Sequence, residues 1–241
     1  MIKIKQNGFL ILERLSNIEL YYTPTSFIND KEIILNEEEF HHSVNVMRNT
    51  IGAKLFITDG EGNLFESEIS SVKKYELTAI IKKRTKFENK SKDIWFCIPN
   101  LKNPDRLKFA FEKCVELGTT NFILFSSKNC ISKNLKPKKF QKTTLAAMKQ
   151  SLRSFLPKII SATFNEIIEM QGTKILFDQN EKQVFNGKLN FVEPGYFLFG
   201  PEGGFDKDEI EAVELKNRFS LASNRLRSET AIIKCASLLK L

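Results

Sequence analysis

Two short segments near the C-terminus contain the residues whose types and spacing could do chemistry. The first is GPEGGF, at residues 200–205, which follows an apolar run and precedes a predicted helix. Its glycines let the backbone approach a ligand closely or adopt a positive φ. The spacing matches neither the GxGxxG pattern of dinucleotide sites nor a phosphate-binding loop that ends in GK[ST]. The segment therefore indicates either a ligand-binding turn of another kind or an ordinary glycine-rich strand–helix turn.

The second segment is RLRSETA, at residues 225–231. Arg225 and Arg227 directly precede the last predicted helix. Arginine is well suited to bind a phosphate or a base, and exposed surface charge is the alternative role. We expect Ser228 to cap the helix, whereas the helix dipole alone explains Glu229.

Other catalytic chemistries find little support in the sequence. No nucleophile–base pair and no pair of carboxylates is arranged for hydrolysis. His41 and His42 lack Cys or carboxylate partners at metal-ligand spacing, so we expect no metal site. The cysteines form no CxxC pair and are predicted to be buried or semi-buried free thiols; they are Cys97, Cys114, Cys130 and Cys235. A transferase that positions two substrates fits this pattern better than a hydrolase does.

The distribution of charge indicates a polyanionic partner. The chain has a net charge of +8, and residues 117–165 contain no Asp or Glu. A surface of one sign attracts polyanions, although a solvated lysine-rich surface is the alternative. The basic residues of this window are Lys128, Lys133, Lys136, Lys138, Lys139, Lys142, Lys149, Arg153 and Lys158.

The elements that must position these residues fall into two parts. Residues 20–88 contain short apolar runs separated by turns, with Asp59-Gly60 as a hairpin signal and a short helix over 37–48, and predict a small β-barrel. Residues 1–19 form either a short helix or a loose extension, and residues 85–92 read as a polar linker.

From residue 93 onward, strands alternate with helices. Apolar strands are predicted at 93–99, 121–127, 174–178, 196–200 and 219–222, with helices at 104–118, 137–155, 206–217 and 228–240. This order predicts an α/β domain with a mostly parallel sheet. No apolar run approaches the ~20 residues of a membrane span, and a signal-peptide pattern is missing. We therefore expect a cytoplasmic protein with no membrane partner.

Five ordered motifs resemble those of the RsmE family, which are 16S ribosomal RNA uridine N3-methyltransferases of the SPOUT superfamily. The resemblance covers residues 20–241. Its motifs are FHHSVNVMR, DGEGNLFESEI, DRLKFAFEKCVELGTT, MKQSLRSFLPKI, and the pair GPEGGF and RLRSETA.

The resemblance implies a fold and an activity. The domains would be an extension of unknown role at 1–19, a PUA-like β-barrel that binds RNA at 20–88, and a SPOUT methyltransferase domain with a deep C-terminal trefoil knot at 89–241. The protein would be a homodimer that uses S-adenosylmethionine to methylate N3 of a uridine in 16S rRNA of the small ribosomal subunit, at the position numbered 1498 in the family.

Site residues follow from the same resemblance. Catalysis would involve Arg227 first and then Arg153, with Gln150 orienting the base, and Ser151 is a further candidate for that role. The expected cofactor-binding residues are Leu176, Phe177, Gly200, Pro201, Glu202, Gly203, Leu221, Ala222, Ser223 and Leu226. The charge pattern adds RNA contacts at Arg106, Lys113, Lys138, Lys139 and Arg225.

Three positions depart from the family pattern. Lys149 stands where many members have Glu, Ala222 where most have Gly, and Ser228 where Thr is common. Because alanine is still small, we expect cofactor binding to be retained. Two alternatives stay open: an RNA-binding or ribosome-assembly protein of this fold without activity, and a SPOUT methyltransferase of another RNA nucleotide.

Overall fold

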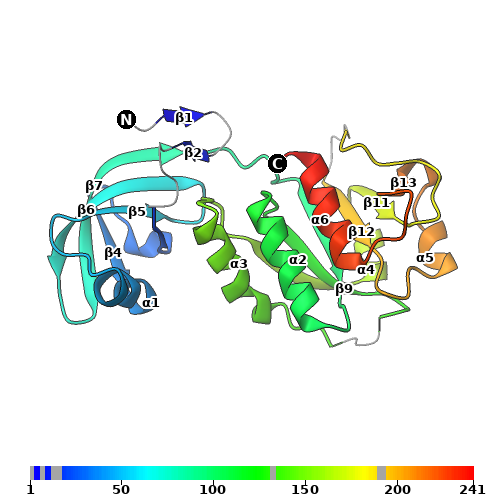
Figure 1. The fold of residues 1–241 in the computed structure, drawn as a ribbon, viewed down its shortest axis with the longest axis horizontal. Helices are drawn as coiled ribbons and strands as arrows, with labels where there is room; N and C mark the ends of the chain where they lie inside the picture. Colours follow the sequence, from blue (N-terminus) through cyan, green and yellow to red (C-terminus); the bar gives the residue numbers. More distant parts are fainter. Residues whose placement is uncertain (1–2, 6–8, 12–17, 131–133, 189–193) are drawn as a thin grey trace. The chain divides into compact units, whose positions relative to one another are not determined.

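Contacts between residues divide the chain into two units. The computed structural model describes residues 3–5, 9–11, 18–130, 134–188 and 194–241 (Figure 1). Unit 1 comprises Met1–Asn89 and Met148–Leu156, and unit 2 comprises Lys90–Ala147 and Pro157–Leu241. The segment Met148–Leu156 thus groups with the N-terminal part, which differs from the undivided domain expected over 89–241. Among the described residues, no helix is both long and apolar enough to cross a membrane.

Unit 1 is built mainly from strands. Its elements are β1 (Lys3–Lys5), β2 (Phe9–Ile11), β3 (Leu20–Tyr22), the 3-10 turn η2 (Thr25–Phe27), β4 (Glu32–Asn36), α1 (Glu37–His41), the π-helical turn η3 (His42–Val46), β5 (Lys54–Thr58), β6 (Asn63–Val72) and β7 (Glu76–Lys86). β1 and β2 pair antiparallel, so this part of the expected extension is a short ribbon rather than a helix.

A five-stranded sheet in the order β3-β5-β6-β7-β4 contains the core of unit 1. Side chains alternate across the strands, so Ile33 and Leu35 face inward with Leu55 and Ile57 and are fully buried. Thr23, which follows the edge strand β3, joins the two edges of the sheet. Its N–H donates to the carbonyl of Thr58 in β5 (3.0 Å), and its hydroxyl donates to the carbonyl of Ile34 in the other edge strand, β4 (3.1 Å).

The predicted hairpin at Asp59-Gly60 is confirmed between β5 and β6. One carboxylate oxygen of Asp59 accepts hydrogen bonds from the backbone N–H groups of Glu61 (2.8 Å) and Asn63 (3.1 Å). Gly60 has φ +75° and Gly62 has φ +93°, a region that favours glycine. The turn is therefore held both by its aspartate and by its glycines.

Unit 2 is the expected α/β domain. Its elements are β8 (Ile94–Pro99), α2 (Pro104–Glu116), β9 (Asn121–Ser126), α3 (Lys138–Gln150), β10 (Lys158–Thr163), α4 (Phe164–Glu169), β11 (Thr173–Phe177), β12 (Gly195–Phe199), α5 (Lys207–Glu211), the 3-10 turn η4 (Leu215–Asn217), β13 (Arg218–Phe219) and α6 (Ser228–Leu239). The strands form one sheet in the order β10-β9-β8-β12-β11-β13, and every pairing is parallel.

Both faces of this sheet are covered, which explains its continuous apolar strands. α2 and α6 contact each other and lie on one face (Figure 1). On β12, Phe197 stacks on Phe96 with ring centroids 5.7 Å apart. Leu198, the next residue of β12, points to the opposite face of the sheet. There it packs with residues of α4 and of the stretch around α5, such as Ile167 and Phe205.

Several predicted boundaries were wrong for local reasons. The helix expected over 137–155 ends at Gln150, because Leu152 has φ +57° and the chain then pairs with the unit 1 hairpin. The helix expected over 206–217 is interrupted between α5 and η4. The polar linker begins later than predicted, since β7 continues to Lys86. β10 and α4 were not predicted; β10 is an edge strand that pairs with β9 alone.

All four cysteines are buried free thiols, as predicted. Burial raises the pKa of Cys97, Cys114 and Cys235 above the ordinary thiol range. Within the described ranges, no group of three or more His, Cys, Asp or Glu side chains is placed to hold a metal ion.

Candidate functional site

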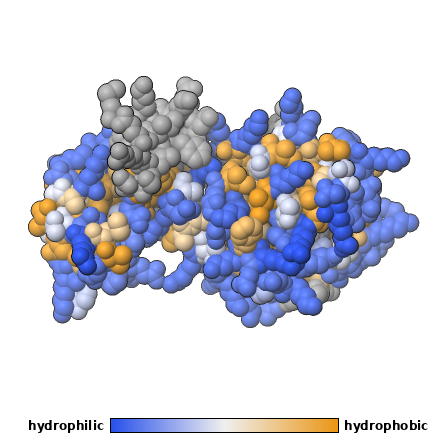
Figure 2. Space-filling model, viewed as in Figure 1, coloured by the Kyte–Doolittle hydropathy of each residue, from blue (hydrophilic) through white to orange (hydrophobic). Residues whose placement is uncertain are grey.

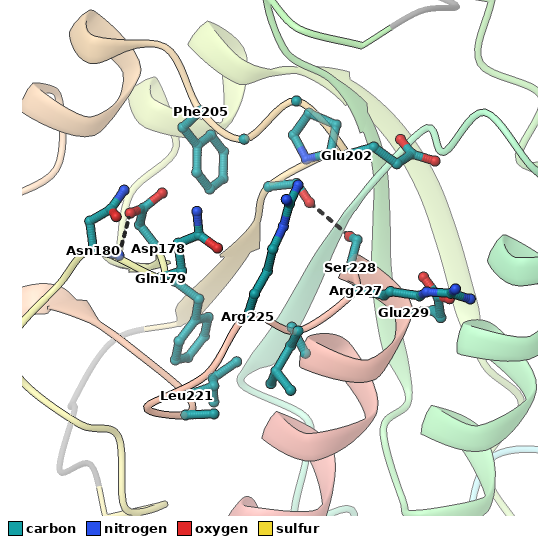
Figure 3. Close-up of a pocket in the computed structure, with 18 of the residues that line it drawn as sticks. Asp178, Gln179, Asn180, Glu202, Phe205, Leu221, Arg225, Arg227, Ser228 and Glu229 are labelled. Atoms are coloured by element: carbon teal, nitrogen blue, oxygen red, sulfur yellow. Dashed lines mark hydrogen bonds between the residues drawn. The ribbon is translucent and has the colours of Figure 1, made fainter.

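A cavity of about 620 Å³ opens at the carboxyl ends of three neighbouring parallel strands of unit 2. It is lined by the segments that follow β11, β12 and β13, together with the first turn of α6 (Figure 3). Ligands of open α/β sheets bind outside the carboxyl ends of the strands. The parallel sheet thus brings together loops that are distant in sequence.

The first wall is the GPEGGF loop, which follows β12. Gly204 has φ +70°, a region that favours glycine. The turn that follows β9 holds the loop in place, because the Asn129 side-chain amide donates to the carbonyls of Gly203 (3.4 Å) and Gly204 (3.1 Å). A Cβ on Gly203 would lie 3.2 Å from the Cβ of Asn129. The segment is therefore a packed and bonded turn whose shape depends on its glycines.

Carboxylates of α5 hold the β9 turn in place. Asp206 and Glu209 form a capping box at the start of α5. Glu209 is buried and also accepts a hydrogen bond from the backbone N–H of Lys128 (2.8 Å). The Lys128 ammonium lies 2.8 Å from Asp206 and 2.6 Å from Asp208. Hydrogen bonds to Asp206 and then to Asp208 raise the pKa of Lys128.

These contacts change the interpretation of the basic window. Lys128 faces two carboxylates, and Lys149 pairs with Glu39 at 2.6 Å. The window is acid-free in sequence, but acids from elsewhere in the chain neutralise part of it. The lysines at the start of α3, Lys138 and Lys139, are exposed, and hydrophilic residues cover much of the face shown in Figure 2. The pairing also explains why a lysine suits position 149 in this chain.

The second wall is the RLRSETA segment. Arg227 is the N-cap residue of α6, and its side chain makes no capping hydrogen bond. Ser228 therefore lies inside the helix and does not cap it as expected. Its hydroxyl instead donates to the carbonyl of Gly200 at 2.7 Å (Figure 3). This bond directly joins the two signature loops, GPEGGF at 200–205 and RLRSETA at 225–231. Glu229 forms an ion pair with Arg106 of α2 at 3.6 Å, so the helix dipole alone does not explain the acidic residue at this position.

The third wall was missed at the sequence level. It consists of Asp178, Gln179 and Asn180, which follow β11. The Asp178 N–H donates to the carbonyl of Phe219 (3.0 Å), and its carboxylate accepts from the Asn180 N–H (2.8 Å). These polar residues come directly after a buried strand, and that position was the available signal.

Most residues expected to bind a cofactor line this cavity. They are Phe177, Gly200, Pro201, Glu202, Gly203, Leu221, Ala222 and Leu226. Leu176 and Ser223 do not belong to the lining. Leu176 is fully buried and faces the α4 side of the sheet, because neighbouring strand residues point to opposite faces. Glu202 also accepts from the Lys102 N–H at 3.0 Å, which ties the loop to the start of α2.

The predicted catalytic and RNA-contact residues are divided between the two units. Arg106, Arg225 and Arg227 line the cavity, and Arg225 extends across it in Figure 3. Gln150 and Arg153 belong to unit 1. Burial lowers the pKa of Arg153.

The remaining predicted RNA contact, Lys113 of α2, is engaged within its own helix. Its ammonium lies 2.9 Å from Glu112 and 2.7 Å from Glu116. It is therefore less available to a phosphate than the exposed lysines of α3.

Comparison with known proteins decides the family. Residues 88–240 match the model of the RNA methyltransferase domain. The chain belongs to the RNA methyltransferase family. Residues 35–82 match the RNA methyltransferase PUA domain, so unit 1 of this methyltransferase-family protein is PUA-like.

Relatives and solved structures agree with this assignment. Ribosomal RNA small subunit methyltransferase E of Bacillus subtilis is 29% identical over 215 residues, covering 80% of this chain and 84% of that protein. The enzyme of the same name from Rickettsia conorii is 25% identical and covers 88% and 91%. The Neisseria gonorrhoeae enzyme bound to S-adenosyl methionine has the same fold, with a TM-score of 0.80, 24% identity and 91% and 95% coverage. The resemblance to the RsmE family is thereby confirmed.

Proposed function

We propose that the protein is an S-adenosylmethionine-dependent methyltransferase that methylates N3 of a uridine in 16S rRNA of the small ribosomal subunit. The observation that carries the proposal is the cavity that both signature loops line in a chain of the RNA methyltransferase family. The names of the curated relatives and the ligand of the Neisseria structure support the substrate and the cofactor.

The residues of the cavity fit this cofactor. Its volume of about 620 Å³ lies within the usual range for small-molecule sites. Phe177, Leu221 and Leu226 provide apolar lining for a purine ring, whereas the first turn of α6 presents N–H groups suited to a carboxylate. Asp178 and Glu202 provide carboxylates that suit the positively charged groups of the cofactor. When bound, the cofactor supplies a methyl group already activated on a sulfonium.

The work of the protein is then orientation and charge stabilisation. Uracil N3 carries a proton and becomes nucleophilic as that proton is lost to water, while negative charge spreads onto N3 and the neighbouring oxygens. A guanidinium can stabilise such charge, and we assign this role to Arg227, which lines the cavity. The target base must be unpaired or flipped, because N3 lies on its Watson–Crick edge.

Further roles complete the proposal. Gln150 and Arg153 orient the base, and Arg106, Arg225, Lys138 and Lys139 contact the RNA backbone. The protein acts in the cytoplasm as a homodimer, and its C-terminal domain contains the trefoil knot typical of the SPOUT superfamily. Residues 20–88 form the RNA-binding domain and 89–241 the methyltransferase domain.

Transfer of labelled methyl groups tests the proposal. The protein is incubated with labelled S-adenosylmethionine and small ribosomal subunits that lack the modification, and the product RNA is mapped by mass spectrometry. Label at a uridine N3 is expected. Label on another nucleotide indicates a different specificity, and RNA binding without calorimetric binding of the cofactor indicates a protein that has lost the activity.

The role of Arg227 has its own test. Arg227→Ala is expected to lower kcat by about 100-fold, a typical loss for a group that stabilises transition-state charge, while the cofactor Kd stays within twofold. Lys207→Ala is a matched control, because Lys207 is an exposed cation on α5 that pairs with its own helix. Unchanged kcat in Arg227→Ala would refute the assigned role.

A further inference from the structure

The segment that contains Gln150 and Arg153 is held by the β-rich unit. α3 ends at Gln150, and Met148–Leu156 groups with unit 1 although the flanking stretches of chain belong to unit 2. Its conformation is therefore determined by the contacts that it makes with the β5–β6 hairpin, α1 and the apolar residues nearby.

Backbone hydrogen bonds fasten the end of this segment to the hairpin. The Gly62 N–H donates to the carbonyl of Ser154 (2.9 Å), and the Leu156 N–H donates to that of Gly60 (2.8 Å). The buried Thr58 hydroxyl also donates to Ser154 (3.2 Å). Residues 154–156 thus form a short additional β-pairing with the hairpin.

The two hairpin glycines allow this close approach. A Cβ on Gly62 would lie 2.5 Å from the Phe155 ring, and a Cβ on Gly60 would lie 2.8 Å from the Cβ of Leu156. Both distances are shorter than a van der Waals contact. The glycines therefore permit the docking of the segment as well as the hairpin turn.

An ion pair fastens the start of the segment. The Lys149 ammonium lies 2.6 Å from Oε1 of Glu39 in α1, and the two side chains are 24% and 15% exposed. Oε2 of Glu39 is buried and has no hydrogen-bond partner among the described residues. Removing one partner of such a pair leaves a poorly solvated charge, which is strongly unfavourable.

Between these two attachments the chain makes a tight turn. Leu152 has φ +57° and packs against Leu20 and Leu64 of unit 1. The Arg153 N–H donates to the carbonyl of Met148 at 2.9 Å. Gln150 and Arg153 therefore lie on a turn that is anchored on both sides and in the middle.

We propose that Glu39 and Lys149 are positioning residues, through which the PUA-like unit sets the conformation of residues 150–153 for methyl transfer. This inference rests on the proposed function, in which Gln150 and Arg153 orient the base. It assigns unit 1 a role in the chemical step that is separate from RNA binding. Loss of the ion pair is therefore expected to lower kcat and to leave the KM for RNA and the cofactor Kd unchanged.

Charge exchange across the ion pair tests the proposal. Lys149→Glu places two carboxylates together and is expected to lower kcat by about 10-fold, since small displacements of positioned groups cost large factors in rate. Glu39→Lys should behave alike, and the double variant Glu39→Lys/Lys149→Glu should recover most of the kcat. The matched control exchanges the exposed pair Lys73 and Glu76, at 2.7 Å in the same unit, and should leave kcat unchanged.

The outcomes separate the inference from the proposed function. Equal kcat in wild type and both single variants would overturn the inference, as would a change confined to KM for RNA or a loss that the double variant does not recover. A wild type without methyl transfer would overturn the proposed function instead. In that case amide hydrogen exchange still tests whether the ion pair holds the segment on unit 1. Lys149→Glu should speed exchange at Gly62 and Leu156, and unchanged exchange would show that the ion pair does not anchor the segment.

Discussion

The hydroxyl of Ser228 joins the two signature loops, and its removal tests whether this bond shapes the cavity. It donates to the carbonyl of Gly200 at 2.7 Å, and both residues line the cavity. Ser228→Ala removes the donor without adding bulk. Alanine is also well tolerated in the first turn of a helix. The variant therefore isolates the effect of one hydrogen bond between the loops.

The size of the effect follows from the hydrogen bond. A bond of this kind contributes about 1 kcal/mol net. Without it, the Gly200 loop is free to leave the conformation that binds the cofactor, and the apparent Kd rises in proportion to the population lost. A loss of about 1 kcal/mol limits the increase in Kd to about fivefold.

Isothermal titration with S-adenosylmethionine measures this change. Ser228→Thr is the matched control, because threonine keeps the hydroxyl, and its Kd should stay within twofold of the wild-type value. Urea unfolding of the three proteins checks that each is folded at the temperature of the titration. Equal affinities for wild type and Ser228→Ala would show that the bond does not shape the site and would refute the reasoning.

Two further predictions concern the stability of the fold. Gly172→Ala should destabilise the protein by more than about 3 kcal/mol in urea unfolding, because φ is +126° and the new Cβ would lie 2.2 Å from the carbonyl oxygen of Pro194; a smaller loss would show that this turn can relax. For Glu66, burial alone would raise the pKa, but hydrogen bonds and charge from Lys54 and Lys83 outweigh it and lower the pKa. Its contribution to stability is thus present at neutral pH and lost as the pH falls through the lowered pKa. Glu66→Gln should therefore reduce the gap in urea midpoint between pH 7 and pH 3, and an unchanged gap would contradict this assignment.

Patterns local in the chain predicted much of the fold. The apolar runs that became β8, β9 and β12 are buried on both faces, so their composition alone indicated a parallel sheet. The β5–β6 hairpin was equally clear, because Asp59-Gly60 carries its turn chemistry in adjacent residues. The edge strand β10 was missed, since its exposed and buried positions do not form a continuous apolar run.

Prediction from the sequence named residues of the glycine- and arginine-rich loops that line the cavity. It failed for Asp178 and its neighbours, which carry no motif and join the cavity only because β11 lies between β12 and β13. It also included Leu176, whose side chain points to the α4 side of the sheet. The face to which a strand residue points depends on its position along the strand, not on its residue type.

The sequence by itself determined the class of fold, the family and the two loops that line the cavity, because these depend on residue types at short spacing. Only the tertiary structure decided how distant residues pair. The bond from Ser228 to Gly200 and the ion pair between Lys149 and Glu39 join residues 28 and 110 positions apart. Sheet order and loop docking determine such contacts, and no local pattern encodes them.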